Sequence, residues 1–297
     1  MILRYLLNSL RYPTLSDFAS SGLGIEARFE RCKPYWAKHL ELTKAFQAAS
    51  LGEARRAGSL AVLGAGRLLD LDLEALSRKF AQIHLFDADP GSLPFWKKAA
   101  GDLGSNCKLE FHLADLSGVL QSWTALLREA LKRGSEMAVI ELLNSLSEPD
   151  VPAPPLRFDC LISLNLLSQI ALFWRDRVHD LVKRNLKIDT DENGLYRSEL
   201  QPALERSMIL LENQHLKLLS SWEAEEVILI CDIERYYYQS DKAPWLCERA
   251  ISADLPAMLG NLELCNHPWS WLWHIAPQGV EQSSYGIIHR VEGRHYR

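Results

Sequence analysis

Glycines and a carboxylate follow two apolar runs of the chain, at positions where they could hold a ligand. The glycine turn Gly64–Gly66 comes directly after the apolar run Leu60–Leu63, and Asp87 comes directly after the run Ile83–Phe86. Glycine leaves room where a backbone must turn tightly and approach a ligand. A carboxylate accepts two hydrogen bonds, which suits the two hydroxyls of a diol. These residues predict a binding site for a polar small molecule.

Two further polar residues stand in the same relation to later apolar runs. Asp115 comes shortly after the run Lys108–Leu113, and Asn165 comes shortly after the run Phe158–Ser163. If the runs are strands of one parallel sheet, their carboxyl ends gather at one crevice, where the strand order reverses. We therefore expect these polar side chains to meet in a single cavity.

The elements that would position these residues alternate between strand and helix. The segments between the early strands are long enough for parallel crossovers, whereas the turn-rich segment at Pro277–Gly279 permits an antiparallel pair. The sequence predicts an α/β fold with a doubly wound, mainly parallel seven-stranded sheet and an antiparallel C-terminal hairpin. The expected strands are Leu60–Leu63, Ile83–Phe86, Lys108–Leu113, Phe158–Ser163, Val227–Cys231, about Leu262–Ile275 and Tyr285–Val291.

The order of these motifs resembles that of the class I S-adenosylmethionine-dependent methyltransferase superfamily. The resemblance covers about residues 58–291 and rests on the segments Leu60–Gly66, Ile83–Asp87, Ala114–Leu116 and Phe158–Leu167. It implies a Rossmann-like domain, S-adenosylmethionine as the cofactor, and transfer of its methyl group to an acceptor. The domains expected are an N-terminal helical cap over 1–57 and a methyltransferase domain over 58–297, with a helical insertion around 186–222.

The resemblance also assigns cofactor contacts to individual residues. The glycine loop would lie beside the methionine part and the ribose, and Asp87 would bind the ribose diol. Asp115 would receive the adenine amino group, Leu116 would pack on the adenine face, and Asn165 would face the methionine part or the substrate. The residues predicted to bind the cofactor are Gly64, Ala65, Gly66, Asp70, Asp87, Ala88, Asp115, Leu116 and Asn165.

The sequence departs from the superfamily pattern at two positions of the glycine loop. The usual acid two residues before the first glycine is Val62 here, and Leu68 stands in place of the third glycine. Asp70 or Asp72 could supply the missing carboxylate from the start of the next helix. Capping of that helix is the alternative, and it is favoured for Asp72.

An amphipathic helix is expected ahead of the first strand, between residues 24 and 51. Arg28, Arg31 and Tyr35 share one face at helical spacing, and the resemblance implies that such a helix covers the cofactor. We expect these three residues to bind substrate, with His39 and Asn165 as candidate catalytic residues and His39 as the base. A solvated arginine face and a packed Trp36 are the alternative.

A second candidate wall of the substrate site lies near the C-terminus. Tyr236 follows the expected fifth strand and is also predicted to contact substrate, as part of an aromatic wall. Asp232 and Glu234 could meet a polar or cationic acceptor there, or could be exposed loop acids. The other aromatic residues are Tyr237, Tyr238, Trp245, Trp269, Trp271 and Trp273, and core packing is the favoured role of the three alternating tryptophans.

Composition narrows the class of protein. The net charge is −5 at 297 residues, which argues against general binding of nucleic acid, because that normally requires a broad basic surface. No apolar run approaches the length of a bilayer span, and the spacing of Cys and His predicts no metal site. We expect a cytoplasmic protein that acts on a small molecule or a protein side chain.

Two alternatives to a methyltransferase stay open. Gly64–Gly66 followed by Asp87 also resembles the fingerprint of an NAD(P)-dependent oxidoreductase, although the third glycine of that fingerprint is Leu69 here. The substitutions at Val62 and Leu68 would also suit a catalytically inert, methyltransferase-like binding protein. Neither the acceptor nor the oligomeric state follows from the sequence.

Overall fold

The central sheet forms from the apolar runs of the chain, which are buried on both faces. The computed structural model describes residues 10–12, 15–52, 58–103, 107–191, 194–239 and 246–297. The strands are β1 (Ser59–Leu63), β2 (Gln82–Asp87), β3 (Lys108–Leu113), β4 (Cys160–Leu164), β5 (Glu226–Tyr238), β6 (Leu246–Arg249), β7 (Trp269–Ala276) and β8 (Gly286–Tyr296). Every residue of β1 and β4 is buried, as expected for central parallel strands covered on two sides.

The strand order is β3-β2-β1-β4-β5-β8-β7, with β6 paired to β5 outside this path. The first five strands pair in parallel, and β8 pairs antiparallel with both β5 and β7. The order reverses between β1 and β4. This confirms the doubly wound sheet with an antiparallel C-terminal hairpin, and β6 adds an eighth strand that the sequence did not predict.

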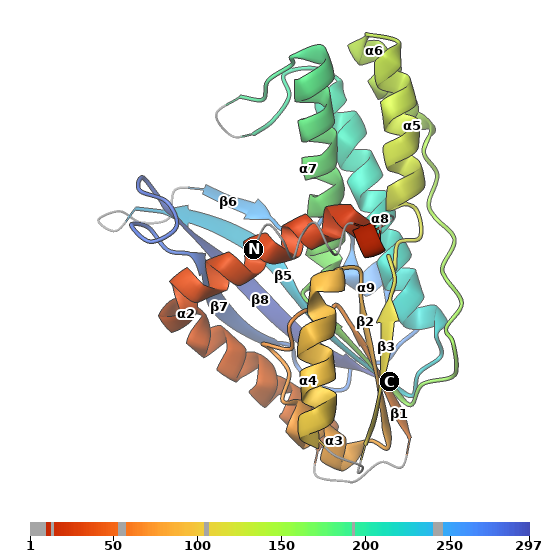
Figure 1. Cartoon of the computed structure of the whole chain (residues 1–297), viewed down its shortest axis with the longest axis vertical. Helices are drawn as coiled ribbons and strands as arrows, with labels where there is room; N and C mark the ends of the chain where they lie inside the picture. The colour runs from red at the N-terminus through yellow and green to blue at the C-terminus, as the bar shows by residue number, and fades with distance from the viewer. Residues whose placement is uncertain (1–9, 13–14, 53–57, 104–106, 192–193, 240–245) are drawn as a thin grey trace.

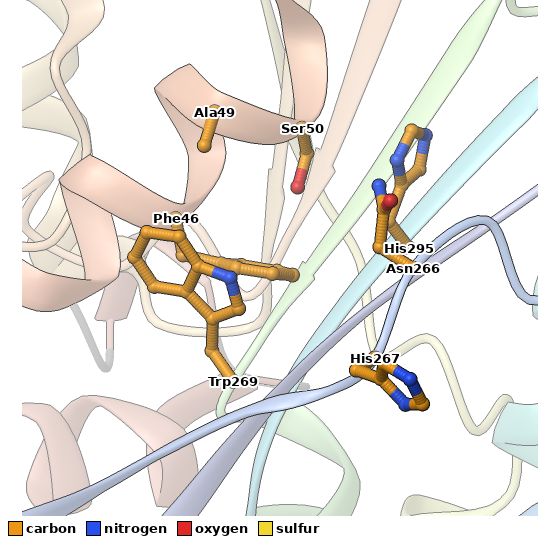
Figure 2. Close-up of a pocket in the computed structure, with 7 residues that line it drawn as sticks. All are labelled: Phe46, Ala49, Ser50, Asn266, His267, Trp269 and His295. Atoms are coloured by element: carbon orange, nitrogen blue, oxygen red, sulfur yellow. The ribbon is translucent and has the colours of Figure 1, made fainter.

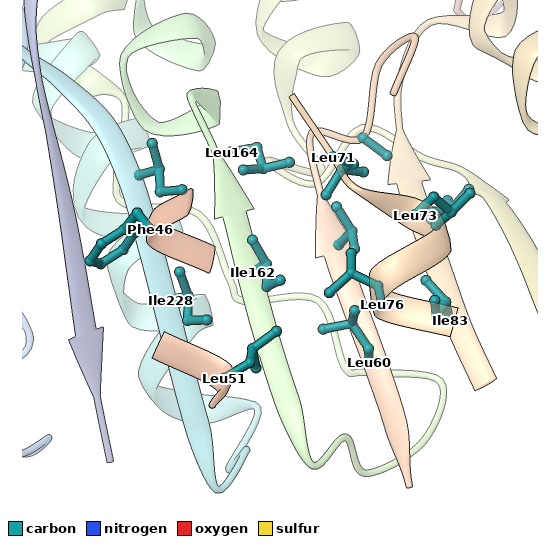
Figure 3. Close-up of a cluster of buried hydrophobic side chains, with 14 of the residues drawn as sticks. Phe46, Leu51, Leu60, Leu71, Leu73, Leu76, Ile83, Ile162, Leu164 and Ile228 are labelled. Carbon is teal, nitrogen blue, oxygen red and sulfur yellow. The ribbon is translucent and has the colours of Figure 1, made fainter. Parts of the chain in front are cut away.

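Helices cover both faces of the sheet and extend beyond one end of it (Figure 1). The helices are α2 (Ser16–Leu51), α3 (Leu73–Lys79), the 3-10 turn η2 (Pro90–Ser92), α4 (Leu93–Leu103), α5 (Leu120–Lys132), α6 (Glu136–Ser145), α7 (Leu166–Leu186), α8 (Leu200–Ser221) and α9 (Leu255–Met258). One buried cluster joins the sheet to α2, α3 and α4, and Figure 3 shows its residues from α2, α3 and the sheet. A second cluster joins the other face of the sheet to α8 and α9.

A third hydrophobic cluster holds a helical bundle at the end where the parallel strands finish. It joins α5, α6, α7 and α8 through residues such as Trp123, Val139, Trp174 and Leu204. Figure 1 shows α5, α6 and α7 projecting past that end of the sheet. The helical layer is therefore larger than the insertion expected around 186–222, because α5 and α6 from an earlier crossover pack against it.

The helix α2 lies across the sheet and bends about midway (Figure 1). It contains Pro34, which lacks an amide hydrogen and clashes with the preceding turn, so a bend is expected there. Its N-terminal end reaches the bundle, where Phe18 stacks on Phe173 of α7 at 4.3 Å between ring centroids. The helix begins earlier than the expected boundary at residue 24.

The strand β5 continues well beyond the expected end at Cys231. Polar residues follow Cys231, and they suggested a loop, but β8 pairs with them through a bulge between Asp232 and Glu234. The Arg290 guanidinium lies 2.7 Å from Glu234 on this extension. Cross-strand ion pairs of this kind stabilise the pairing of neighbouring strands.

No helix in the described part of the chain combines the length and apolar character of a bilayer span.

Candidate cofactor site

The glycine turn forms the floor of the site at the carboxyl end of β1. The amides of Gly64 and Ala65 both donate to the carbonyl of Phe86 at 3.0 Å, which binds the turn to β2. Gly64 has φ of 78°, and a β-carbon there would lie 2.8 Å from the carbonyl oxygen of Leu164. Leu68, which replaces the third glycine of the pattern, still has φ of 62°, in the left-handed region that favours glycine.

Asp87 lies beside this turn at the end of β2. Its Oδ2 accepts the amide of Gly66 at 2.8 Å, and its Oδ1 accepts the amide of Asp89 at 2.7 Å. Burial raises the pKa of Asp87 to about 6, against the effect of these backbone hydrogen bonds. Each oxygen has two lone pairs, so the carboxylate keeps acceptor capacity for two hydroxyls.

Asp70 and Asn165 meet where the strand order reverses. The Asn165 amide nitrogen donates to Asp70 Oδ2 at 3.2 Å, and Asn165 follows β4 in a left-handed conformation with φ of 49°. Burial raises the pKa of Asp70 to about 6. The Asn165 Oδ1 is buried and has no hydrogen-bond partner within the residues that the structure describes. The usual acidic position, Val62, is buried inside the sheet.

The proposed carboxylate at Asp72 instead stabilises the start of α3. Its side chain accepts the amide of Ala75 at 3.0 Å, as a helix N-cap does. This confirms the capping alternative for Asp72. Of the two carboxylates, Asp70 is therefore the one that contacts Asn165.

The unfolding free energy is expected to depend on the protonation of Asp70. Its pKa is higher in the folded protein than in the unfolded chain, so the folded state binds the extra proton as the pH falls from about 7 to about 4. Asp70 therefore contributes stability at acid pH and loses it above about pH 6. Buried histidines have the opposite effect, because their protonation destabilises the folded state at acid pH. The useful quantity is therefore the difference in unfolding free energy between wild type and Asp70→Asn.

We expect Asp70→Asn to be more stable than wild type at pH 8, by about 2 kcal/mol, and to lose that advantage by pH 4. Urea unfolding at a series of pH values measures this difference. Asp72→Asn is the matched control, because it removes an exposed carboxylate from the same segment. A pH-independent difference for Asp70→Asn would contradict the assignment.

Asp115 and Leu116 lie at the end of β3. The Asp115 carboxylate accepts the amide and hydroxyl of Ser117 at 3.0 and 2.6 Å, and the amide of Leu120 at 3.2 Å. Burial raises the pKa of Asp115. Leu116 is buried in the same cluster as Phe86. The contacts of Asp115 and Leu116 with adenine stay predictions. The cofactor contacts of Ala65 and the half-buried Ala88 also stay predictions.

A buried ion-pair cluster ties the glycine loop to α2, and the sequence did not reveal it. The Arg67 side chain lies 2.7 Å from Asp89 and 3.0 Å from Glu26. A β-carbon at Gly22 would overlap the Asp89 carboxylate, so the helix backbone approaches that loop closely. Arg67 follows the glycine turn directly, but nothing in the sequence pairs it with a helix 41 residues earlier.

Arg28 and Arg31, predicted to bind substrate, contact the loop between β7 and β8. Both guanidinium groups bind Glu281, at 3.0 and 2.8 Å. Burial alone would raise the pKa of Glu281, but the hydrogen bonds and charges of both arginines hold it below its ordinary value. Tyr35 is exposed on the same helix. The roles of these three residues toward substrate stay predictions.

Glu281→Gln is expected to loosen α2. Loss of the carboxylate charge weakens both arginine contacts, so amides in the N-terminal half of α2 should exchange with deuterium about threefold to tenfold faster. Amides of β1 and β4 should be unaffected. Glu30→Gln is the control, because Glu30 pairs with Lys33 on the exposed face of α2. Equal exchange in both variants would show that Glu281 does not fix the helix.

His39, the candidate base, lies inside the packing between α2 and β7. Its Nδ1 accepts the indole N–H of Trp271 at 3.0 Å, and its ring stacks on Trp273 at 4.1 Å. Burial lowers the pKa of His39 to about 4, so the ring is neutral at pH 7. A neutral imidazole is the basic form, and the catalytic role of His39 stays a prediction.

His39→Phe is expected to reduce the free energy of unfolding by about 1–2 kcal/mol, because the ring is kept and the buried Trp271 N–H loses its acceptor. Chemical denaturation measures the loss. The double variant His39→Phe/Trp271→Phe removes both partners, and its loss should be smaller than the sum of the two single losses. Strict additivity would contradict the importance of this hydrogen bond.

The alternating tryptophans face α2, as expected for one face of a strand. Trp269 contacts Phe46, Trp271 contacts His39, and Trp273 packs edge-on against Trp36 at 4.9 Å. Tyr236 lies on the β5 extension, where its hydroxyl donates to Glu234. Its contact with substrate stays a prediction, and Trp245 lies outside the described residues.

A cavity of about 280 Å³ opens beside the C-terminal end of α2 (Figure 2). Its lining consists of Phe46, Ala49, Ser50, Asn266, His267, Trp269 and His295. None of these residues belongs to the glycine turn or to the polar residues that follow β2, β3 and β4. The cavity is therefore separate from the candidate cofactor site.

Within the described ranges, no three His, Cys, Asp or Glu side chains are grouped to hold a metal ion.

Comparisons with known proteins give distant similarities only. No protein-family model and no curated protein matches the sequence. A S-adenosylmethionine-dependent methyltransferase from Aquifex aeolicus is similar in structure, with 9% identity, a TM-score of 0.38, and coverage of 84% of this chain and 85% of that one. The 1,6-didemethyltoxoflavin-N1-methyltransferase of Burkholderia thailandensis, with S-adenosylhomocysteine bound, is similar at 12% identity and a TM-score of 0.37. The similarity covers 93% of this chain and 90% of that one.

Proposed function

We propose that this protein transfers the methyl group of S-adenosylmethionine to a small molecule or a protein side chain. The observation that carries the proposal is the Asp70 and Asn165 pair beside the glycine turn. The half-buried carboxylate of Asp70 and the buried Asn165 amide oxygen, which has no partner among the described residues, are both acceptors, so they favour a ligand group that is positively charged and rich in N–H. The α-ammonium of a methionine moiety is such a group.

The other residues at this edge suit the remaining parts of the same cofactor. Asp87 keeps acceptor capacity for the ribose hydroxyls, and the left-handed Gly64 and Gly66 let the ligand approach the backbone. Leu116 offers an apolar surface to adenine. The cofactor supplies an activated methyl group, so the chain has only to align the acceptor and take its proton where one must leave.

The start of α3 argues against the nicotinamide alternative. Dinucleotide-binding folds place the pyrophosphate on free amides at the helix N-terminus, next to the glycine turn. Here residues 67–72 separate Gly66 from α3, and the Asp72 carboxylate already accepts the Ala75 amide. A carboxylate in that position repels a phosphate group. The neutral sulfur or sulfonium of an adenosyl amino acid has no such conflict.

Calorimetric titration with S-adenosylhomocysteine, S-adenosylmethionine, NADH and NADPH tests the proposal. We expect the two adenosyl amino acids to bind at one site and the nicotinamide cofactors not to bind. Binding of NADH or NADPH alone would overturn the proposal. If S-adenosylhomocysteine binds, incubation of cell extract with methyl-labelled S-adenosylmethionine separates an enzyme, which labels a small molecule or protein, from an inert binding protein.

A further inference from the structure

Asp232 is a buried carboxylate on β5, just beyond the end of β4. The amide of Asn165 donates to the carbonyl of Ile230 at 2.8 Å, so Asp232 stands two residues further along β5. The hydroxyl of Ser168, in the first turn of α7, donates to Asp232 Oδ2 at 3.2 Å. Ser168 stands three residues after Asn165, which directly precedes α7.

The second oxygen of this carboxylate, Oδ1, is the atom on which the inference depends. Asp232 has no exposed surface, and its Oδ1 is without a hydrogen-bond partner in the described part of the chain. Buried carboxylate oxygens are normally satisfied, because an unsatisfied one loses its solvation without compensation. The geometry therefore leaves an acceptor for an N–H or O–H group that the described residues do not supply.

His289 holds the carboxylate in place from β8. Its Nδ1 lies 2.9 Å from Asp232 Oδ2, and its Nε2 accepts the Arg235 Nε at 3.3 Å. Because arginine only donates, the Nε2 contact leaves the proton of a neutral His289 on Nδ1, facing Asp232. His39 lies near the same carboxylate, on α2.

The charged groups around Asp232 keep it ionised. Burial would raise the pKa of the Asp232 carboxyl, but the contact with His289 outweighs burial. The charge of Arg235 acts in the same direction, so the pKa of Asp232 lies below its ordinary value. Ser168 is the neutral group that faces it from α7.

Asp232 lies on the opposite side of the candidate site from Asp87. Along the carboxyl edge the order is Asp87 on β2, the glycine turn on β1, Asn165 after β4, and Asp232 on β5. The adenosyl group of the proposed function occupies the β2 and β1 side. An acceptor must then approach from the β5 side, where Asp232 lies.

We propose that Asp232 Oδ1 binds the nucleophilic group of the methyl acceptor, with His289 as a positioning residue, and that this group is a nitrogen or oxygen that carries hydrogen. This inference rests on the proposed function. The acceptor's lone pair forms the bond to the methyl carbon, and the bond from that carbon to sulfur breaks with its electron pair left on sulfur. The acceptor's proton passes to Asp232 Oδ1.

Sinefungin tests this geometry without knowledge of the acceptor, because an ammonium-bearing carbon replaces the sulfonium and its methyl group. If Asp232 faces the methyl position, wild type should bind sinefungin at least about tenfold more tightly than S-adenosylhomocysteine, the effect of one charge-assisted hydrogen bond. In Asp232→Asn this ratio should fall to about 1, with the affinity for S-adenosylhomocysteine unchanged. Calorimetry measures both affinities.

Asp70→Asn is the matched control. It should weaken both ligands equally, because they share the amino acid part, and leave their ratio unchanged. A ratio near 1 in wild type, or a ratio that survives Asp232→Asn, overturns the assignment of Asp232. Failure of wild type to bind S-adenosylhomocysteine at all overturns the proposed function and this inference with it.

A pH series on wild type decides the question if Asp232→Asn does not fold. Both affinities should fall as the pH drops through about 6, where Asp70 and Asp87 gain protons. The ratio of the two affinities should persist to about pH 5, because the pKa of Asp232 is held low. A ratio that collapses near pH 6 assigns the ammonium to Asp70 or Asp87 and overturns the proposal.

Discussion

Asp70→Asn is expected to weaken the binding of S-adenosylhomocysteine about 10- to 100-fold at pH 8. The substitution keeps the size of the side chain and an acceptor oxygen, but it removes the charge that we place against the ligand's ammonium group. A hydrogen bond to a charged partner contributes about 1.5–3 kcal/mol, which gives this range. The same variant is more stable without ligand, because a buried charge has been removed.

The control for this prediction is a ligand without the ammonium group. 5′-Methylthioadenosine keeps the adenosine and the sulfur but lacks the amino acid part, so wild type and Asp70→Asn should bind it equally, within about twofold. Isothermal calorimetry of both ligands with both proteins forms a closed cycle. Equal loss for the two ligands would mean that Asp70 acts on the fold of the site and not on the ammonium group.

Local patterns in the sequence were sufficient to predict the parallel half of the sheet. Short apolar runs followed by polar residues predicted β1 to β4, and the switch in strand order placed Gly64, Asp87 and Asn165 at one edge. The prediction that Asp72 caps α3 was also correct, because Asp72 directly precedes that helix. These features depend on neighbours in the chain, which a sequence shows directly.

Features that depend on distant pairing could not be predicted. Asp232 and Glu234 suggested the end of a strand, and only pairing with β8 extends β5 beyond them. The contact of His289 with Asp232 joins residues from two strands that no pattern relates. The same holds for Arg67, whose partners lie on α2 and on the loop after β2.

The features that the sequence did not predict lie on two sides of the candidate site. The Arg67 cluster fixes α2 over the glycine loop, and the contacts of Glu281 with Arg28 and Arg31 fix the same helix to the β7–β8 loop. On the β5 side, α2 contributes His39 to the surroundings of Asp232. A single helix therefore borders the proposed cofactor residues and the proposed acceptor residue, so changes in its position affect both.

Gly64→Ala is expected to reduce the free energy of unfolding by about 3–5 kcal/mol. Two effects add at this position. The backbone has φ of 78°, which strains any residue with a β-carbon, and the new carbon would lie 2.8 Å from the Leu164 carbonyl and 3.1 Å from the Leu166 side chain. The β1 turn must then move away from the end of β4. Urea denaturation measures the loss, and S-adenosylhomocysteine binding should disappear with it.

Gly279→Ala separates the two effects, because Gly279 has the same φ of 78° and no atom within 4 Å of its β-carbon position. Backbone strain alone should reduce its unfolding free energy by about 1 kcal/mol, with ligand affinity unchanged. The excess loss in Gly64→Ala then measures how closely β1 and β4 approach at the reversal of strand order. If both variants lost the same stability, the turn would have room to spare, and the crevice would not depend on glycine there.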